Sequence, residues 1–249
     1  RFVNVKNVFR KDIKEHYIKE FSEDHLLVLV YMQRFTVHNR NRIDFCMGWL
    51  FDDLGIEKSN VKKDLNNALC DLVDWGLIKP YREIDWDKIN KNTRITTYAV
   101  SFDEQFTKIY DSEIDKILDA DVDYRQKKTM LLLYCDIASR IDDKGYCFPS
   151  YESFKADLNT TSDNRIDNAL LALKEYGLID YDNVGQIKID NRITQGNNVY
   201  VLCVDKDYKE KLHIGLQNRR REYEEGKARI HKGKHSNKRR SIKQKLNHL

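Results

Sequence analysis

A short stretch of the sequence occurs twice, and this internal repeat limits the possible folds more than any other feature. Residues 66–78 read NNALCDLVDWGLI, and residues 167–179, which begin 101 positions later, read DNALLALKEYGLI. The two stretches share, in register, an asparagine, an alanine, two leucines, an aromatic residue and the closing Gly-Leu-Ile. Internal repeats mark recurring structural units. The chain of 249 residues is therefore expected to hold two related units.

The sequence on either side of each copy predicts three helices. A strongly apolar segment comes first, and Ser22 is a good N-cap for this segment in the first copy. Pro149 suits the start of a helix in the second copy, because no amide partner is needed there. Each repeated stretch ends at a glycine, as helices do when a left-handed residue closes them. The predicted helices span about 22–32, 47–54 and 60–75, and about 126–137, 150–158 and 163–176.

Strand-like sequence follows each copy. Alternating β-branched and aromatic residues near turn residues predict a hairpin, and Arg-Ile-Thr occurs in both hairpins, at 94–96 and at 192–194. Three helices followed by a two-stranded hairpin make a winged helix-turn-helix. The expected fold class is mainly α with small β-hairpins (α+β), arranged as two tandem winged-helix domains with a basic C-terminal tail.

The segment between the copies has apolar residues at helical spacing, among them Phe102, Ile109 and Ile114, and contains neither Gly nor Pro. This pattern predicts a helical connector that holds the two units at a fixed geometry. The predicted organisation is a first winged-helix domain at 1–100, the connector at 101–124, a second winged-helix domain at 125–205 and a basic, partly disordered or helical tail at 206–249.

Over about residues 8–205, this arrangement resembles the replication initiators of plasmids and phages of low-GC Gram-positive bacteria. The resemblance is carried by Tyr17 and Ser22 followed by Leu-Leu, by the Phe148-Pro149-Ser150 entry to a helix, by the aromatic-Gly-Leu-Ile ends, and by the strand Val199-Tyr200-Val201-Leu202. It implies a protein that binds origin DNA and recruits host replication proteins.

The third helix of each unit is the candidate DNA-reading element. Apolar residues form one stripe along it, and polar residues near its N-terminus lie on the opposite face. Asparagine suits adenine and arginine suits guanine through paired major-groove hydrogen bonds. Because the two faces differ, the two half-sites are expected to differ too. The candidate base-reading residues are Asn60, Lys63, Asn66 and Asn67 in the first unit, and Asn164, Arg165 and Asn168 in the second.

Positive charge is unevenly distributed, although the net charge of the chain is only +4. Residues 217–249 hold 12 Lys and Arg against 3 Glu, a net of +9, which leaves 32 basic and 37 acidic residues and a net of −5 elsewhere. Clustered cations bind phosphates, so the tail is expected to attract nucleic acid; a solubilising extension is the alternative. The candidate phosphate contacts are Arg82, Lys88, Lys91 and Arg94 in the first hairpin, Lys188 and Arg192 in the second, and Arg219, Arg220, Arg221, Lys238, Arg239 and Arg240 in the tail.

Sequence motifs for catalysis and metal binding are missing. The sequence has no Gly-x-x-x-x-Gly-Lys-Ser/Thr phosphate loop, His231 and His235 lack carboxylate neighbours, and Cys135 and Cys147 lack zinc spacing. We therefore expect neither an enzyme nor a cofactor or metal. The longest apolar run, residues 26–32, is far shorter than the ~20 residues that span a bilayer, so no membrane association is expected. Five cysteines without paired spacing predict a reducing, cytoplasmic setting.

Three functions remain open at this point. A replication initiator would bind several spaced sites in one region of double-stranded DNA and work with host replication proteins, as a monomer acting as a pseudo-dimer or as a homodimer. A transcription regulator of the same fold would bind one operator near a promoter. The third function is a protein-interaction module in a nucleoprotein assembly, in which only the tail contacts nucleic acid.

Overall fold

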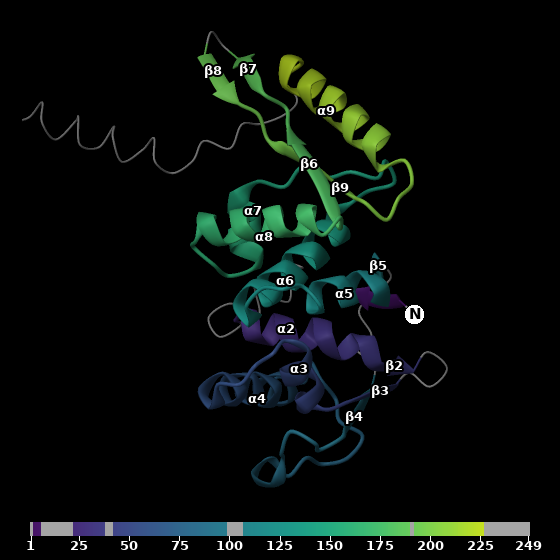
Figure 1. Cartoon of the computed structure of the whole chain (residues 1–249), viewed down its shortest axis with the longest axis vertical. Helices are drawn as coiled ribbons and strands as arrows, with labels where there is room; N and C mark the ends of the chain where they lie inside the picture. Colours follow the sequence, from purple (N-terminus) through teal and green to yellow (C-terminus); the bar gives the residue numbers. More distant parts are fainter. Residues whose placement is uncertain (1, 6–21, 38–41, 99–106, 190–191, 227–249) are drawn as a thin grey trace, which may run out of the picture.

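The computed structural model describes residues 2–5, 22–37, 42–98, 107–189 and 192–226 (Figure 1). Helices dominate and the strands form small antiparallel sheets, so the predicted α+β class is confirmed. The first unit (residues 22–98) lies at one end of the long axis and the second unit (residues 124–224) at the other. Within the described part of the chain, no helix is both long and apolar enough to cross a membrane.

In the first unit, three helices are combined with a small three-stranded sheet. Ser22 caps the first of them as predicted, because its hydroxyl accepts a hydrogen bond from the Asp24 amide. Gly76 closes the third helix at a φ of 71°, a left-handed conformation that glycine adopts without steric cost. The elements are α2 (Glu23–Met32), η1 (Gln33–Phe35), β2 (Thr36–Val37), β3 (Arg42–Phe45), α3 (Met47–Asp53), α4 (Ser59–Asp74), η3 (Trp86–Lys88) and β4 (Ile95–Tyr98).

The sheet of the first unit differs from the predicted two-stranded hairpin. β4 pairs with β3, and β3 pairs with β2, although neither β2 nor β3 was expected from the sequence. The segment before the wing pairs with β4 only through an isolated bridge between Pro80 and Thr97. Two backbone hydrogen bonds flank this bridge, from the Tyr81 amide to the Thr96 carbonyl and from the Tyr98 amide to the Lys79 carbonyl, both at 2.9 Å.

In the second unit, three helices precede a longer wing than predicted. Ser150 caps α7 by accepting a hydrogen bond from the Ser153 amide, so Pro149 lies just outside this helix and not in its first turn. β6 pairs with β9, and β7 pairs with β8, which extends the hairpin by a second two-stranded piece. The elements are α6 (Tyr124–Arg140), α7 (Tyr151–Asp157), α8 (Asp163–Glu175), β6 (Ile179–Asn183), β7 (Gln186–Ile189), β8 (Arg192–Gln195), β9 (Asn198–Leu202) and α9 (Tyr208–Glu224).

The connector between the units is only partly helical. The spacing of Phe102, Ile109 and Ile114 predicts a helix, and this prediction is wrong at Ile109. Ile109 lies in the strand β5 (Thr107–Tyr110), which pairs with β1 (Phe2–Val5). Ile109 is buried there, so the same apolar residue serves a strand as well as it would a helix. Phe102 lies outside the described residues. Helix α5 (Asp111–Leu118) follows as predicted and packs on α6.

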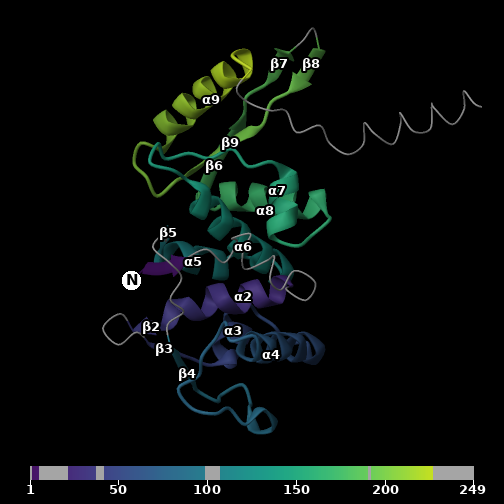
Figure 2. The same cartoon turned by 180° about the vertical axis from the view of Figure 1, so that it is seen from behind.

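The two units share one continuous hydrophobic core. α2 contacts α4 on one side and α6 on the other (Figures 1 and 2). All residues from Leu26 to Met32 are therefore buried, as expected for a helix that is apolar around its whole circumference. The apolar stretch from Met130 to Cys135 on α6 is buried for the same reason. The two apolar segments thus form the central layers of the molecule.

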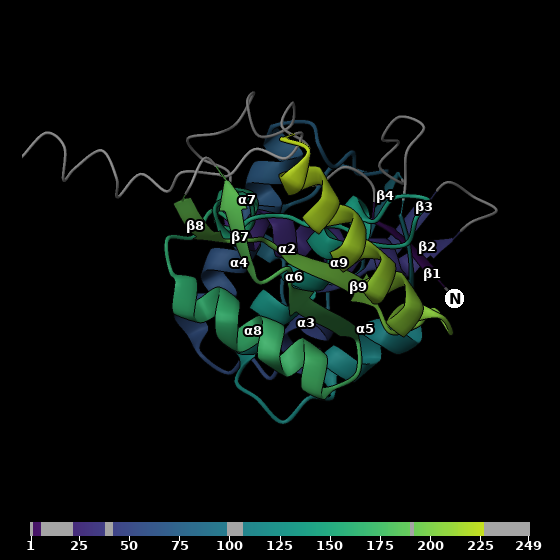
Figure 3. The same ribbon diagram turned by 90° about the horizontal axis from the view of Figure 1, so that it is seen from above.

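Helix α9 covers the sheet of the second unit. It contacts β6, β7 and β9 and runs across them (Figure 3). Leu212 and Tyr223 pack with Val199 and Val201 in a second, smaller apolar cluster. The predicted continuation of a helix after Lys206 is confirmed, and this helix is a packed part of the second unit.

Candidate nucleic-acid interface

α3 and α4 are the two helices predicted to form a helix-turn-helix in the first unit. Gly55, at a φ of 64°, makes the turn between them, and Leu65, Ala68, Leu69 and Leu72 bury the inner face of α4. The outer face agrees with the sequence prediction at three positions, where Asn60, Lys63 and Asn67 are exposed.

Asn66 does not belong to that outer face. It is half-buried, and its side-chain oxygen is enclosed by protein. A position next to the apolar stripe cannot be assigned to one face from spacing alone, since a helix turns by about 100° per residue. The outward orientation predicted for Asn66 is therefore wrong.

The helix-turn-helix of the second unit is formed by α7 and α8. Ser162 caps α8 by accepting a hydrogen bond from the Arg165 amide at 3.3 Å. Asn164 and Asn168 are exposed near the start of this helix, as predicted. Leu171 continues the same face one turn later and is 52% exposed. Leu171 is not among the predicted base-reading residues, although its spacing from Asn164 and Asn168 places it on the same face of α8.

Arg165 is held by the first unit and does not point away from the protein as predicted. Its two terminal nitrogens donate to the two carboxylate oxygens of Glu23, both at 2.6 Å. Its Nε donates to the hydroxyl of Thr129 on α6 at 2.7 Å. Glu23 is the first residue of α2, so the Arg165 side chain of α8 forms hydrogen bonds with both α6 and α2. The sequence gives no signal for a partner 142 positions away.

Lys128 extends this ionic contact between the units. Its ammonium lies 2.8 Å from Asp24 and 3.4 Å from Glu23, and only 14% of its side chain is exposed. The contact borders an open hollow of about 610 Å³ between the starts of α6 and α8. Asn164, Arg165 and Asn168 line this hollow together. The N-terminal end of α8 is thus a recessed polar surface with two free asparagines and one restrained arginine.

The first wing folds back against α3. The amide of Gly48 donates to the Lys91 carbonyl at 2.8 Å, and a side chain on Gly48 would approach that carbonyl oxygen to 2.3 Å. The four predicted cations of this wing are all exposed. Lys88 is paired with Asp85 at 2.5 Å, and the Arg94 guanidinium lies 5.9 Å from the centre of the Trp49 ring. The four cations are Arg82, Lys88, Lys91 and Arg94.

The second wing is an extended hairpin supported by α9. Lys188 lies in β7 and Arg192 in β8, in paired strands, while their side chains lie outside what the structure describes. Ile187 of β7 is buried in the apolar cluster below α9. The two wings therefore differ in shape although the helices before them share a sequence motif.

The arginine cluster at 219–221 is only partly available for phosphates. The Arg219 guanidinium lies 4.0 Å from the centre of the Phe148 ring and 4.8 Å from that of Tyr223, and it is paired with Glu222 at 2.8 Å. Only 11% of the Arg219 side chain is exposed, so the predicted phosphate contact is wrong for this residue. Arg220 and Arg221 are exposed on α9. Lys238, Arg239 and Arg240 lie outside the described residues.

The five cysteines are free thiols. Burial raises the pKa of the Cys135 and Cys147 thiols far above its usual range, and nearby carboxylates, Asp136 among them, raise it further. Burial also raises the pKa of Cys203, to about 11. These three thiols are therefore protonated at neutral pH and act as apolar side chains.

One family model matches part of the second unit. The family model of a helix-turn-helix domain matches residues 127–179, which contain most of α6, all of α7 and α8 and the start of β6. No curated protein matches the chain. The match to a helix-turn-helix domain supports a DNA-binding protein. α8 is the second helix of this motif, and in such domains the second helix enters the major groove.

Proposed function

We propose that the protein is a sequence-specific binder of double-stranded DNA that reads two half-sites with α4 and α8, and that it serves as a plasmid or phage replication initiator. The observation that carries this proposal is the repetition of the matched unit. α2, α3 and α4 follow one another as α6, α7 and α8 do, and a glycine with positive φ ends both third helices. In this proposal the protein binds DNA, recruits host replication proteins and catalyses no reaction.

The exposed faces of the two helices support direct reading of bases. Asn60 and Asn67 on α4 and Asn164 and Asn168 on α8 are free to donate and accept the paired hydrogen bonds that recognise adenine. Leu171 offers an apolar surface that suits a thymine methyl group. Arg165 is unsuited to guanine in this conformation, because Glu23 already occupies its guanidinium.

The contact between the units supports a fixed spacing of the half-sites. The shared core and the Glu23–Arg165 ion pair hold α4 and α8 in one body. A monomer would then act as a pseudo-dimer on two unequal half-sites. An inserted half-turn between the half-sites would rotate one of them away from its helix.

The test is selection of bound sequences from a random duplex library, followed by footprinting. The protein truncated after Gly226 retains every described helix and strand, so it separates sequence reading from attraction by the tail. Two protected half-sites on one face of the duplex are expected, and five inserted base pairs between them should abolish specific binding. If the truncated protein showed no sequence preference, direct reading would be excluded and an interaction module would be favoured.

Asn168→Ala tests the contribution of α8. We expect it to weaken specific binding by about 1–3 kcal/mol and to leave non-specific binding unchanged, because an asparagine that reads a base contributes only at the correct base. Glu175→Ala, an exposed change at the other end of α8, is the matched control. Titration of labelled specific and non-specific duplexes gives both affinities; an equal loss on the two would make Asn168 a phosphate contact.

A further inference from the structure

Two tyrosines form an exposed aromatic surface on the sheet of the first unit. Tyr81 and Tyr98 are stacked, with ring centres 4.0 Å apart and 17° between their planes. They are 43% and 46% exposed. Ring stacking of this kind stabilises a fold most when it is buried. An exposed stack leaves ring surface free for a further planar group.

The strands of this sheet place charged residues beside the two rings. Ile43, Phe45, Ile95 and Thr97 face the core, so the alternate positions face outward. The outward residues pair in register across the strands: Arg42 lies opposite Tyr98, and Asp44 lies opposite Thr96. The aromatic surface is thus continuous with a polar, arginine-bearing sheet face.

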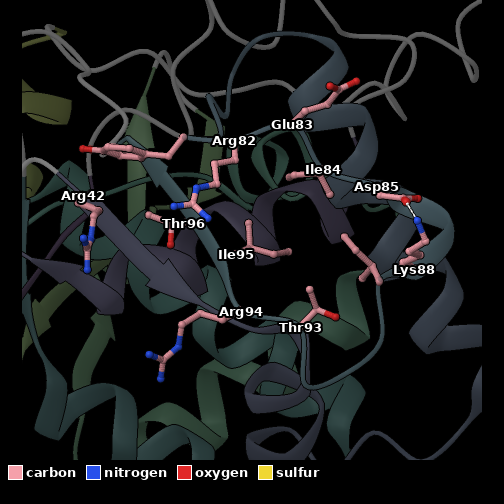
Figure 4. Close-up of a pocket in the computed structure, with 12 residues that line it drawn as sticks. Arg42, Arg82, Glu83, Ile84, Asp85, Lys88, Thr93, Arg94, Ile95 and Thr96 are labelled. Carbon is pink, nitrogen blue, oxygen red and sulfur yellow. Dashed lines mark hydrogen bonds and ion pairs between the residues drawn. The ribbon is translucent and has the colours of Figure 1, made fainter.

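Three arginines surround a hollow of about 540 Å³ next to the aromatic surface. Figure 4 shows the side chains of Arg42, Arg82 and Arg94 around Thr96, with Glu83, Asp85 and Lys88 on the other side of the hollow. Tyr81 also lines it. A planar group on the rings would therefore have guanidinium groups beside it.

The arginines differ in their partners. Arg42 donates to Asp44 through two nitrogens, at 2.9 and 2.5 Å, and Thr96 donates to the other carboxylate oxygen at 2.7 Å. Burial raises the pKa of the Asp44 carboxyl, but hydrogen bonds from Thr96 and Arg42, together with the positive charges of Arg42 and Arg94, lower it below its ordinary value. Among the described residues, no carboxylate is paired with Arg82 or Arg94. Both guanidinium groups are exposed and can approach an anion, although the charge of Arg94 also acts on Asp44 and its guanidinium lies 5.9 Å from the centre of the Trp49 ring.

We propose that this surface binds single-stranded DNA, with a base stacked on Tyr81 and Tyr98 and the neighbouring phosphates held by Arg82 and Arg94. Exposed aromatic rings beside cations are what an unpaired strand needs, because its bases offer free faces and its backbone offers charge. A duplex cannot use the rings in this way, since its bases are already stacked on one another. This inference rests on the proposed function, because it assumes that the protein works on DNA.

The test measures binding of the full chain to a fluorescent single-stranded pyrimidine oligonucleotide by anisotropy. The variants are the double substitution Tyr81→Ala/Tyr98→Ala and its conservative counterpart Tyr81→Phe/Tyr98→Phe, which keeps both rings. We expect the alanine pair to weaken binding roughly tenfold or more, because base–aromatic stacking has about this effect. The phenylalanine pair should bind within about twofold of the original protein.

Salt dependence separates the arginines from the rings. Arg82→Ala should reduce the slope of log affinity against log salt by about 0.7, the value for one phosphate of a single strand. The alanine pair of tyrosines should leave that slope unchanged, since the rings carry no charge. Lys116→Ala removes one positive charge from an exposed position of α5, outside every candidate contact surface, and should leave the slope unaltered.

The outcomes distinguish this inference from the proposed function. The same variants are titrated with the selected duplex, whose affinity the tyrosine changes should not alter. A further outcome is that the original protein binds no duplex sequence-specifically and still binds the single strand in a way that the alanine pair weakens. That result would overturn the proposed function and support the inference. Undiminished single-strand binding by the alanine pair would overturn the inference. An oligoribonucleotide bound in place of the DNA strand, or self-association that the alanine pair abolishes without any oligonucleotide binding, would also overturn it.

Discussion

The wings of the two units differ far more than the helices that precede them. In the first unit the segment after α4 turns back onto α3, and the sheet carries β2 and β3 beside β4. In the second unit the wing extends through β7 and β8, and α9 covers it. There, a single bridge between Cys147 and Tyr200 occupies the place that β3 has in the first unit.

This difference shows what the repeated motif determines. Its leucines and alanine bury one face of the third helix against the same kind of apolar helix in both units, and its glycine ends that helix. The wings lie outside the motif and depend on neighbours that are not repeated, namely Gly48 for the first and α9 for the second. Two copies of one motif are therefore followed by different surfaces.

The largest effect is expected when the second wing loses its support from α9. Tyr223 is 2% exposed, and its hydroxyl accepts a hydrogen bond from the Asn197 amide at 3.3 Å. Tyr223→Ala should lower the free energy of unfolding by about 3 kcal/mol, because it leaves a cavity below the wing. Hydrogen exchange should show the loss of protection in β7 and β8, with β3 and β4 unchanged. Tyr81→Ala, at a tyrosine of the first unit that is 43% exposed and stacked on Tyr98, is the control and should cost only about 1 kcal/mol.

A smaller effect is expected when the contact between the units is broken. Glu23→Gln removes one charge from the pair with Arg165, in which 13% and 31% of the two side chains are exposed. The free energy of unfolding should fall by about 1–2 kcal/mol, since hydrogen bonds between charged groups at a partly buried site contribute about this much.

The same Glu23→Gln variant also tests the rigidity of the pair of units. Released from the carboxylate, Arg165 could reach DNA, so the preference for one spacing between half-sites should weaken. Glu152→Gln, in the exposed pair of Glu152 with Lys155 within the second unit, is the matched control. Equal losses of stability in the two variants, measured by chemical denaturation, would show that the contact between the units contributes no more than a surface pair.

The sequence predicts the helices well because their signals are local. Ser22, Gly76 and Gly177 mark helix ends through their own backbone chemistry, and the apolar stripes are evident from spacing. The site is predicted less well because its errors involve distant partners. Arg165 forms an ion pair with Glu23, and the Arg219 guanidinium lies over the rings of Phe148 and Tyr223. No local sequence pattern predicts such contacts between distant residues. The strand β3 is missed for the same reason, since its partner β4 lies about fifty residues further along.

The docking of the first wing should be sensitive to one methyl group. Gly48→Ala places a Cβ atom at 2.3 Å from the Lys91 carbonyl oxygen, which belongs to the backbone and cannot rotate away. We expect a loss of about 1–2 kcal/mol in the free energy of unfolding, partly offset by the higher helix propensity of alanine. Glu152→Ala changes the corresponding second position of α7, where the residue is exposed, and should be nearly neutral. A Gly48→Ala protein as stable as the original would mean that the first wing can shift without cost.

The smallest effect concerns the pH dependence of the first sheet. The pKa of Asp44 is lowered in the folded protein, against the effect of burial, by hydrogen bonds from Thr96 and Arg42. A lowered folded-state pKa means that Asp44 stabilises the fold above its unfolded-state pKa, and that this contribution is lost as the pH falls through the folded-state pKa. Asp44→Asn should therefore cost about 1 kcal/mol at neutral pH and nothing at strongly acidic pH.

Asp182→Asn, an exposed change in β6 of the second unit, is the control and should cost less than about 0.5 kcal/mol, because surface substitutions are close to neutral. Denaturation of both variants across the acidic range provides the measurement. A constant difference between Asp44→Asn and the original protein at every pH would contradict the role of the ionised carboxylate. The contribution of Asp44 would then come only from the geometry of the hydrogen bonds that Arg42 and Thr96 donate to it, which asparagine reproduces in part.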